Sequence, residues 1–333
     1  QMLDLNLNAN LSGWCRAVIA DLEMARELGL RMVNLSLPVS KLQIEAIAKN
    51  EEWVIGQLKL CLTYANQHFD FITVGAQDSS RADNLFLNRY IETAVSFNNV
   101  KRIRIADTVG IMNPFTVFDL FKGLIKTFPL TEFEFHGHND LGMANANALA
   151  AVKAGAGAIS GTVNGLGERC GNTPIEEFVL ALQYSEGTDL GVNKLRLRSV
   201  CELVATITGR KIHRSKPFSG ADCFTHESGI HTRSLLVNEL SYQAFKAEDL
   251  GTEKRFVFGK HSGSAAVLAI LKENGIVPDT QQLILLMEKV KSDSKFSTSG
   301  LMANDIIEMY RKMFGVEVVL TTKTTPPAYV LFH

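Results

Sequence analysis

The chain has 333 residues, of which 46% are hydrophobic and 21% are charged, a composition typical of a globular protein with a large buried core. Its net charge of −1 at pH 7 argues against both a nucleic-acid-binding surface and a polybasic membrane-binding surface. No apolar run predicts a transmembrane helix, and the five cysteines, far apart and without C-x-x-C spacing, indicate reduced thiols and a cytoplasmic location.

From about residue 9 to residue 186, short apolar runs alternate with longer amphipathic segments, which predicts parallel strands joined by crossover helices. Ser40 and Gln43 form a capping box that begins a helical run to about residue 67, and Asn113 with Pro114 marks another helix start. The predicted strands end in WCR (14–16), NLS (34–36), ITVG (72–75), IAD (105–107), FHGH (135–138) and TVN (162–164).

Six strand–helix units in about 178 residues are compatible with two architectures. A closed (β/α)8 TIM barrel requires eight units and typically about 250 residues, so two units would be absent. A doubly wound sheet of six strands requires no missing piece. No G-x-G-x-x-G sequence opens a helix after the first strand, which weakens a dinucleotide-binding version of the second architecture. The local pattern does not decide between them.

Beyond about residue 187 the pattern changes to helical segments separated by polar turns, which indicates a second region. It contains a polar patch at 224–245 and the glycine-flanked sequence FGKHSG at 258–263. The predicted helices lie near 194–209, 262–274, 281–293 and 300–315, ahead of a Thr/Pro-rich tail.

The sequence FEFHGHNDLG places two histidines at the end of a predicted strand. Because side chains alternate along a strand, His136 and His138 lie on one face, together with Glu134. In a TIM barrel the carboxyl ends of the strands form the active-site mouth. Two imidazoles at this spacing can share a divalent ion, but two polar residues bonded to the backbone explain a bare H-x-H sequence equally well.

A catalytic metal site normally has about three protein ligands plus open positions. Asn172, in a glycine-rich segment after the next strand, could supply an oxygen ligand. Asp107 is the local strand-end carboxylate, although hydrogen bonding to the amides of the following turn is the favoured interpretation. His231 and Tyr242 belong to the second region, where an isolated histidine is more often structural than catalytic.

Several aromatic and thiol side chains are expected to be structural. Phe115, Phe118 and Phe121 recur at helical spacing and are expected to form the core-facing side of a helix. Cys15 and Cys61 are expected to be small buried apolar residues. None of these residues is expected to enter a functional site.

The segments FEFHGHNDLGMANANALAAVKAGA (133–156) and TVNGLGERCGNTPIEE (162–177) closely resemble the family of 2-isopropylmalate and homocitrate synthases, which are metal-dependent Claisen-condensing (β/α)8 barrels. The resemblance extends to WCRAVIADLEMA, LSLPVSKLQI, TVGAQDSSRAD, RIRIADTVGIMNPF, THESGIH and FGKHSG, and covers about residues 9–275. Among family members, the nitrogenase-associated homocitrate synthases are the most similar. The resemblance implies an α/β TIM barrel without its first two units at 1–187, helical subdomains at 188–315 and a tail at 316–333.

The same resemblance implies an acyltransferase that condenses acetyl-CoA with a 2-oxo acid and uses a divalent metal (Mg, Mn or Zn). The expected 2-oxo acid is 2-oxoglutarate, which would give homocitrate and CoA. Syntheses of 2-isopropylmalate, citramalate or citrate from other 2-oxo acids remain alternatives, and a retro-aldol lyase is disfavoured because THESGIH and the helical region match the synthases. Neither a nucleic acid nor a membrane is an expected partner.

In the family, the helical region of one subunit completes the site of the other, so the resemblance implies a homodimer with shared active sites. The residues that match family motifs fall into three groups: His136, His138 and Asn172 as metal-site residues; Glu134, Thr108 and Arg16 as substrate-binding residues; and His231, Tyr242 and Gln77 as catalytic residues.

Two departures from the family pattern affect the expected chemistry. The first-strand motif D-T-T-L-R-D-G-E-Q, which carries the third metal ligand in the family, does not occur in the sequence. We therefore expect residues upstream of Gln1 or, alternatively, a complementary N-terminal chain without which this chain would be inactive. In addition, Gln77 occupies a position at which the family usually has Glu, and a neutral amide cannot take up a proton.

Overall fold

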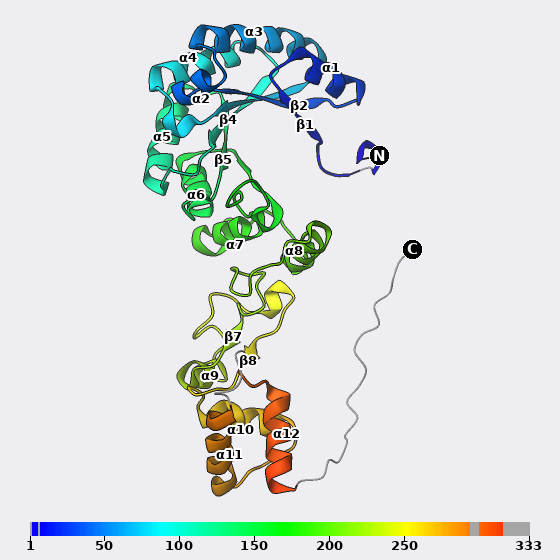
Figure 1. Ribbon diagram of the computed structural model, residues 1–333, viewed down its shortest axis with the longest axis vertical. Helices are drawn as coiled ribbons and strands as arrows, with labels where there is room; N and C mark the ends of the chain where they lie inside the picture. The colour runs from blue at the N-terminus through cyan, green and yellow to red at the C-terminus, as the bar shows by residue number, and fades with distance from the viewer. Residues whose placement is uncertain (1, 6, 294–299, 316–333) are drawn as a thin grey trace. The chain divides into compact units, whose positions relative to one another are not determined.

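The computed structural model describes residues 2–5, 7–293 and 300–315 (Figure 1). The chain forms two compact units, one comprising residues up to 193 together with 199–212, and the other comprising 194–198 and the residues from 213 onward. Within the described ranges, no helix is both long and apolar enough to cross a membrane. The predicted tail at 316–333 lies outside the described residues.

The first unit is built on a parallel sheet in which the strands follow one another in sequence order. A doubly wound sheet reverses its strand order at a switch point, and this sheet has no reversal, so that alternative is wrong. The strands are β1 (Ser12–Arg16), β2 (Met32–Pro38), β3 (Phe71–Gln77), β4 (Val100–Asp107), β5 (Glu132–Gly137) and β6 (Ala158–Ser160).

The connecting helices begin largely where the sequence predicts. Ser40 accepts a hydrogen bond from the Gln43 amide at 3.2 Å, and the Asn113 side chain caps the helix that starts with Pro114. The helices are α1 (Ile19–Glu27), α2 (Lys41–Ala46), α3 (Glu51–His68), α4 (Asn84–Val95), α5 (Pro114–Thr127), α6 (Ala144–Ala154) and α7 (Ile175–Glu186), with 3-10 turns η1 (Met2–Leu5), η2 (Ser79–Arg81) and η3 (Val163–Gly165).

Two predicted boundaries are wrong. The helical run after Ser40 is divided into α2 and α3, because Ala48 adopts a left-handed conformation with φ of 53° and Asn50 caps a new helix. The sixth strand ends at Ser160 rather than in TVN, because the Thr162 amide bonds to the Thr173 carbonyl at 3.0 Å within the following loop.

The two faces of the sheet have opposite chemical character. Alternate strand residues such as Leu35, Val74 and Ile105 are fully buried in one hydrophobic core with residues of the helices. Figure 1 shows these helices along one side of the sheet. The other face carries polar residues, including Arg104 and Glu134. Helices on one face and sequential strand order make this unit part of a TIM-type barrel rather than a doubly wound sheet.

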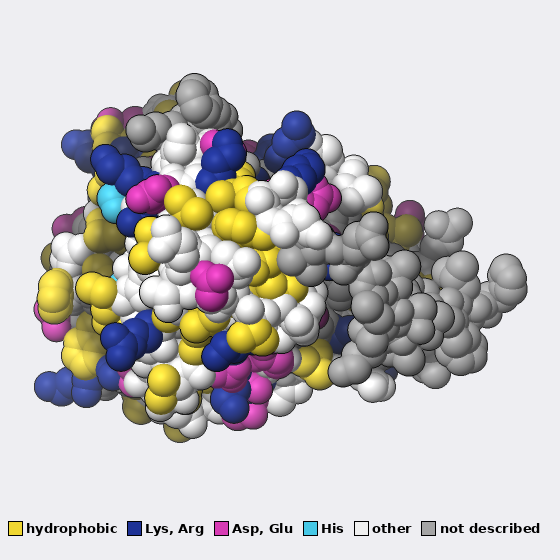
Figure 2. Space-filling model, turned by 90° about the horizontal axis from the view of Figure 1, so that it is seen from below, with side chains coloured by type: hydrophobic (Ala, Val, Ile, Leu, Met, Phe, Trp, Pro, Cys, Tyr) yellow, Lys and Arg dark blue, Asp and Glu magenta, His cyan; other side chains and the backbone are white. Residues whose placement is uncertain are grey.

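The second unit contains short strands and a helical cluster. Its hydrophobic core includes Phe258, Leu271, Leu286 and Ile306. On the face seen in Figure 2, hydrophobic side chains are interspersed with charged ones, as on an ordinary water-exposed surface. The elements are β7 (Thr225–His226), α9 (Gly229–Leu235), η4 (Glu248–Leu250), β8 (Arg255–Phe256), α10 (Ser264–Glu273), α11 (Thr280–Asp293) and α12 (Ala303–Phe314), and α8 (Lys194–Thr208) spans the division between the units.

The aromatic contacts between α5 and the sheet give a stability prediction. Phe121 is fully buried, and its ring centroid lies 6.4 Å from that of Phe133 and 6.0 Å from that of Phe135. Replacing it with alanine would leave a cavity between helix and sheet. We expect Phe121→Ala to lower the free energy of unfolding by about 3 to 5 kcal/mol in urea denaturation.

Phe115→Ala is the matched control, because Phe115 belongs to the same helix but is 82% exposed. It lies in the first turn of α5, ahead of the residues that pack against the sheet, so its predicted core position is wrong. We expect a change within about 0.5 kcal/mol for this variant. Equal losses in the two variants would contradict the packing of Phe121 against Phe133 and Phe135.

Candidate functional site

Backbone hydrogen bonds join the loops at the carboxyl ends of three neighbouring strands. The His138 amide donates to the Asp107 carbonyl at 3.3 Å, and the Asn139 amide donates to the Gly171 carbonyl at 2.9 Å. His138 also forms an antiparallel bridge with Asn172. Only glycine fits at position 171, because φ there is +92° and a Cβ would lie 2.1 Å from the carbonyl oxygen of Gly165 in the same loop. The loops after β4, β5 and β6 therefore form one edge.

The two histidines of β5 and its loop lie side by side at this edge. Their ring centroids are 5.1 Å apart and the rings are nearly perpendicular. Nδ1 of His136 lies 3.1 Å from the Ser160 hydroxyl, which comes from β6. Burial, together with the positive charge of Arg104, lowers the pKa of His136 to about 4, and burial also lowers the pKa of His138. Both imidazoles are therefore neutral at pH 7, the form that binds metal.

Two buried polar atoms at this edge have no hydrogen-bond partner within the described chain, namely Nδ1 of His138 and Oδ1 of Asn172. The Asn172 amide nitrogen, in contrast, donates to the Leu166 carbonyl at 3.1 Å. Unpaired buried nitrogen and oxygen acceptors are costly, and a bound cation would satisfy them. The nitrogen and oxygen donors of His136, His138 and Asn172 thus fit part of a divalent-metal site.

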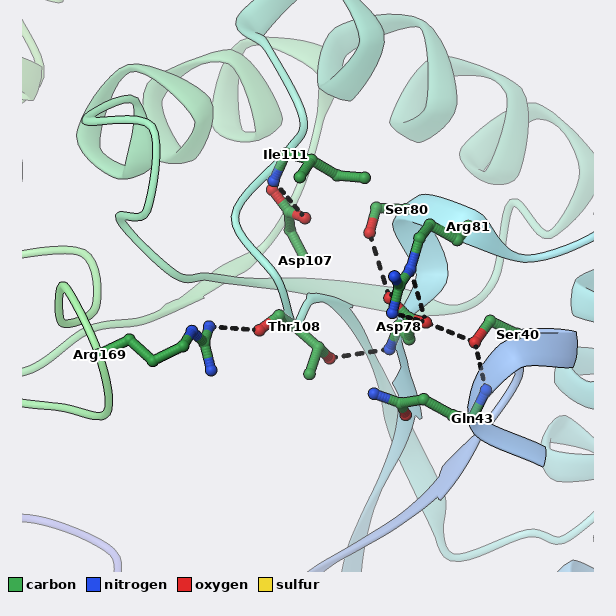
Figure 3. A network of polar contacts seen from close by, with 9 residues as sticks. All are labelled: Ser40, Gln43, Asp78, Ser80, Arg81, Asp107, Thr108, Ile111 and Arg169. Atoms are coloured by element: carbon green, nitrogen blue, oxygen red, sulfur yellow. Dashed lines mark hydrogen bonds and ion pairs between the residues drawn. The ribbon is translucent and has the colours of Figure 1, made fainter. Parts of the chain in front are cut away.

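No carboxylate joins these three residues in the part of the chain that the structure describes, where no group of three or more His, Cys, Asp or Glu side chains is placed to hold a metal. Asp107 is fully buried, and its two carboxylate oxygens accept the backbone amides of Ile111 at 3.1 Å and Met112 at 2.9 Å. The interpretation of Asp107 as a turn-stabilising residue is therefore correct (Figure 3).

A second polar network joins the loops after β2, β3 and β4 (Figure 3). Asp78 is fully buried in a left-handed conformation, and its carboxylate accepts hydrogen bonds from Arg81, at 2.7 Å from Nη2, and from Ser40. Its amide donates to the Thr108 hydroxyl oxygen at 2.8 Å. Since this oxygen already accepts a hydrogen bond, the hydroxyl hydrogen of Thr108 is available to donate to a ligand.

Arg169 continues this network on the other side of Thr108. Its guanidinium donates to the Thr108 carbonyl at 2.6 Å and to both carboxylate oxygens of Asp140 at 2.8 and 3.0 Å. Sequence reasoning missed Asp78, Arg81 and Arg169 as structural partners of the site, although each lies within a motif that carries the family resemblance.

The polar face of the sheet contains a cluster of ion pairs. Glu134 is almost fully buried, with one carboxylate oxygen 2.5 Å from Nε of Arg104 and the other 3.4 Å from Nη1 of Arg102. Arg102 also binds Glu132 through Nε and Nη2. The alternating sequence RIRIAD placed both arginines on the face of His136, but sequence reasoning did not single them out.

The two remaining expected site residues of this unit lie at the ends of β1 and β3. Arg16 forms an ion pair with Asp21 at 2.8 Å, and its side chain is 73% exposed. Gln77 is the last residue of β3 and half-buried, and we observe no hydrogen bond from its side chain to the described residues. The carbonyl of Gln77 accepts the Val39 amide at 3.0 Å, which aligns the ends of β2 and β3.

The second unit brings His231 and Tyr242 together. Their rings are stacked, with centroids 4.0 Å apart and an interplanar angle of 22°. Sequence reasoning missed His226, whose ring centroid lies 6.4 Å from that of His231 and whose Nε2 lies 3.1 Å from the amide nitrogen of Gln243. Tyr242 also borders a cavity of about 260 Å³ whose wall includes Phe218, Phe224 and Phe245. An imidazole and a phenol in contact are suited to proton transfer.

Profiles of two known protein families match consecutive segments of the sequence, and the boundary between these segments lies close to the division between the two structural units. The profile of the HMGL-like family matches residues 1–204. A second profile, described as a homocitrate synthase post-HMGL domain-like region, matches residues 218–296.

The curated relatives that match most of this chain include two synthases. 2-Isopropylmalate synthase 2 of Caldanaerobacter subterraneus subsp. tengcongensis is 40% identical over 86% of this chain and 74% of its own length. Homocitrate synthase 1 of Nostoc sp. is 37% identical over 93% of this chain and 82% of its own length. Among solved structures, an HMG-CoA lyase of Bacillus subtilis superposes with a TM-score of 0.56 and 21% identity, covering 63% of this chain and 74% of the lyase, which supports the barrel-type fold.

The low pKa of His136 gives a prediction for the metal-free protein. The unfolded chain takes up a proton at this histidine near pH 6.5, whereas the folded chain does so only near pH 4. Between these values the unfolded state binds more protons, so the folded state loses stability as the pH falls. We expect the free energy of unfolding to decrease by up to about 2 kcal/mol between pH 7 and pH 5 in urea titrations because of His136.

His136→Asn should make this pH dependence shallower, because the substituted side chain does not titrate. The control is His213→Gln, which replaces an exposed histidine of the second unit and should leave the slope unchanged. An unchanged slope in the His136 variant would show that this histidine is not buried in the neutral form.

Proposed function

Because this chain belongs to the HMGL-like family, we propose that it is an acyltransferase that condenses acetyl-CoA with a 2-oxo acid, with 2-oxoglutarate as the substrate that gives homocitrate and CoA. The match of residues 218–296 to the homocitrate synthase post-HMGL region and the likeness to two synthases support a condensing enzyme over a lyase. The sequence similarity to 2-isopropylmalate synthase 2 keeps 2-oxoisovalerate as the principal alternative substrate.

The observation that carries this proposal is the pair of neutral imidazoles at the carboxyl edge of the sheet, beside the unpaired oxygen of Asn172. His136, His138 and Asn172 would hold the divalent ion, either Mg, Mn or Zn. Such an ion would polarise the ketone of the 2-oxo acid as a Lewis acid. The incomplete ligand set implies that a further ligand comes from outside the described residues or from the substrate.

The neighbouring side chains are suited to bind a 2-oxo acid. The hydroxyl of Thr108 has a hydrogen to donate to the carboxylate next to the ketone, because its oxygen is fixed by the Asp78 amide. Glu134 would border the same acid from the polar face of β5. The Arg16 guanidinium would bind the substrate carboxylate in place of the Asp21 carboxylate. Breaking the ion pair with Asp21 costs little free energy, because this pair is exposed to water.

We assign proton transfer to the stacked pair His231 and Tyr242. A base removes a proton from the acetyl methyl group, and the resulting enolate carbon forms a bond with the ketone carbon, whose oxygen takes up a proton to become the hydroxyl. Water then cleaves the thioester, which releases a carboxylate and CoA. The neutral amide of Gln77 can orient the acetyl group but cannot serve as the base. In a homodimer, the pair of each subunit would complete the site of the other.

The proposal is tested by measuring free CoA released from acetyl-CoA with 2-oxoglutarate, 2-oxoisovalerate, pyruvate and oxaloacetate in parallel, in the presence of Mg, Mn or Zn. We expect turnover with 2-oxoglutarate, loss of turnover on removal of metal with a chelator, and recovery when metal is added back. Turnover with 2-oxoisovalerate alone would identify a 2-isopropylmalate synthase instead. CoA release that does not depend on any 2-oxo acid would contradict the condensation.

A second candidate is a subunit that is active only with a complementary chain carrying the D-T-T-L-R-D-G-E-Q motif. Among the described residues, β1 pairs only with β2, and Trp14 of β1 is 60% exposed, so this edge is open to a further strand. Mixing the chain with a separately produced N-terminal fragment of a family member distinguishes the two candidates. Activity only in the mixture would support the two-chain form, and activity of this chain alone would eliminate it.

The stacked pair gives a mutational prediction. Tyr242→Phe retains the ring that packs on His231 but removes the phenolic hydroxyl. We expect kcat to fall by about 10²- to 10⁴-fold with little change in KM, because general acid–base groups contribute mainly to the transition state. His231→Ala should show a loss of the same order.

Tyr310→Phe provides the matched control, since its hydroxyl donates to Gln282 at 2.7 Å within the helical core of the same unit. This variant should keep the kcat of the parent protein. A Tyr242→Phe enzyme with unchanged kcat would remove Tyr242 from the mechanism.

A further inference from the structure

Arg104 lies on the polar face of the sheet, nearer the amino ends of the strands than the proposed metal ligands. In the strand register it stands beside Gly75 of β3 and Glu134 of β5. The next inward-facing position on β5 is His136, which is paired with Ala106. Two residues along a strand correspond to roughly 7 Å, which is within the length of an extended arginine side chain. Arg104 is thus one layer below the histidine that would hold the metal.

Arg104 and Arg102 differ in how their guanidinium groups are used. Arg102 engages Nε, Nη1 and Nη2 with Glu132 and Glu134. Arg104 engages only Nε, which donates to Glu134. In the described chain its two terminal nitrogens have no hydrogen-bond partner, although the side chain is only 23% exposed. Glu134 therefore fixes the orientation of Arg104 while its terminal nitrogens remain available.

The neighbouring strand β2 adds polar side chains to the same face. Gly75, between Arg104 and Ser36 in the register, has no side chain, and the Ser36 hydroxyl lies over it, 2.0 Å from where a Cβ would be. This hydroxyl donates to the side-chain oxygen of Asn34 at 3.2 Å. Two residues before Ser36, Asn34 is only 4% exposed, and its buried amide nitrogen has no partner within the described residues. This part of the face has more donors than acceptors, so it favours a ligand with acceptor atoms.

On this basis we propose that Arg104 determines substrate specificity by binding the distal carboxylate of a dicarboxylic 2-oxo acid through Nη1 and Nη2. This inference rests on the proposed function, in which the 2-oxo end of the same molecule lies beside His136, His138 and Thr108. A guanidinium with both terminal nitrogens unpaired matches a carboxylate in bidentate geometry. A branched aliphatic 2-oxo acid would instead leave these two terminal nitrogens without a hydrogen-bond partner and partly desolvated, which disfavours it. The carboxylate of Glu134 is neutralised by two arginines, so it does not repel the substrate.

The test compares Arg104→Gln and Arg104→Lys with the parent protein, using two dicarboxylic acids (2-oxoglutarate and oxaloacetate) and two monocarboxylic acids (2-oxoisovalerate and pyruvate). We expect Arg104→Gln to lower kcat/KM for the dicarboxylic acids by about 10- to 100-fold, and Arg104→Lys by less, because lysine keeps the charge but not the bidentate geometry. The monocarboxylic acids should lose less than about threefold, since they make no contact with this guanidinium. Calorimetric dissociation constants for 2-oxoglutarate should rise in parallel.

Arg102→Gln is the matched control, because it breaks ion pairs to Glu132 and Glu134 on the same strand without removing an unpaired donor. It should affect all four acids equally. Equal losses for both classes of acid in Arg104→Gln, or the same selectivity change in Arg102→Gln, would overturn the proposal for Arg104.

If the parent protein condenses none of the four acids, the proposed reaction fails. Calorimetry then still tests Arg104, because its substitution should weaken 2-oxoglutarate binding but not 2-oxoisovalerate binding. A parent protein that binds 2-oxoisovalerate more tightly than 2-oxoglutarate would also overturn the inference, and Arg104→Lys provides a second variant should Arg104→Gln not fold.

Discussion

Parallel pairing of neighbouring strands is the constraint on which the site depends. Because the strands run in one direction, their carboxyl ends and the following loops meet at a common edge, and alternate side chains lie on opposite faces. One face is apolar and packs against the helices, so the other face is free to carry charged residues. The position of His136 beside Ser160, and of Arg104 beside Glu134, follows from this register.

Three buried carboxylates stabilise the carboxyl edge and the polar face of the sheet, and the oxygens of each already accept hydrogen bonds from other residues. Asp78 is paired with Arg81 and Ser40, Asp107 accepts two backbone amides, and Glu134 is paired with two arginines. A buried charge without such partners would cost several kcal/mol, so these groups constrain one another's positions. Among the described residues, the groups without a hydrogen-bond partner here are the neutral side chains of His138 and Asn172, whereas the Thr108 hydroxyl and the terminal nitrogens of Arg104 can still donate hydrogen bonds.

This division matches the chemistry of a 2-oxo acid bound with a cation. Neutral nitrogen and oxygen atoms suit a divalent ion, whereas hydroxyl and guanidinium donors suit carboxylates. The second unit contributes a different kind of group, a stacked imidazole and phenol held beside His226 and Gln243. Under the proposed function, residues of the first unit would polarise the substrate through the bound ion, and residues of the second unit would transfer the proton.

The sequence by itself determined the kind and order of the elements and several of their starts, because caps such as Ser40 and Asn113 act through local hydrogen bonds. It also predicted that His136 and His138 lie on one face, since strand alternation depends only on spacing. It could not decide between a barrel-type and a doubly wound sheet, because strand order depends on contacts between distant segments. Only the tertiary structure showed that Asp107 accepts amides of the following turn and that the Asp78 amide donates to the Thr108 hydroxyl. It also showed that the terminal nitrogens of Arg104 have no hydrogen-bond partner among the described residues. Those facts depend on which side chains from separate strands and loops meet, and the spacing of residues along one segment carries no information about them.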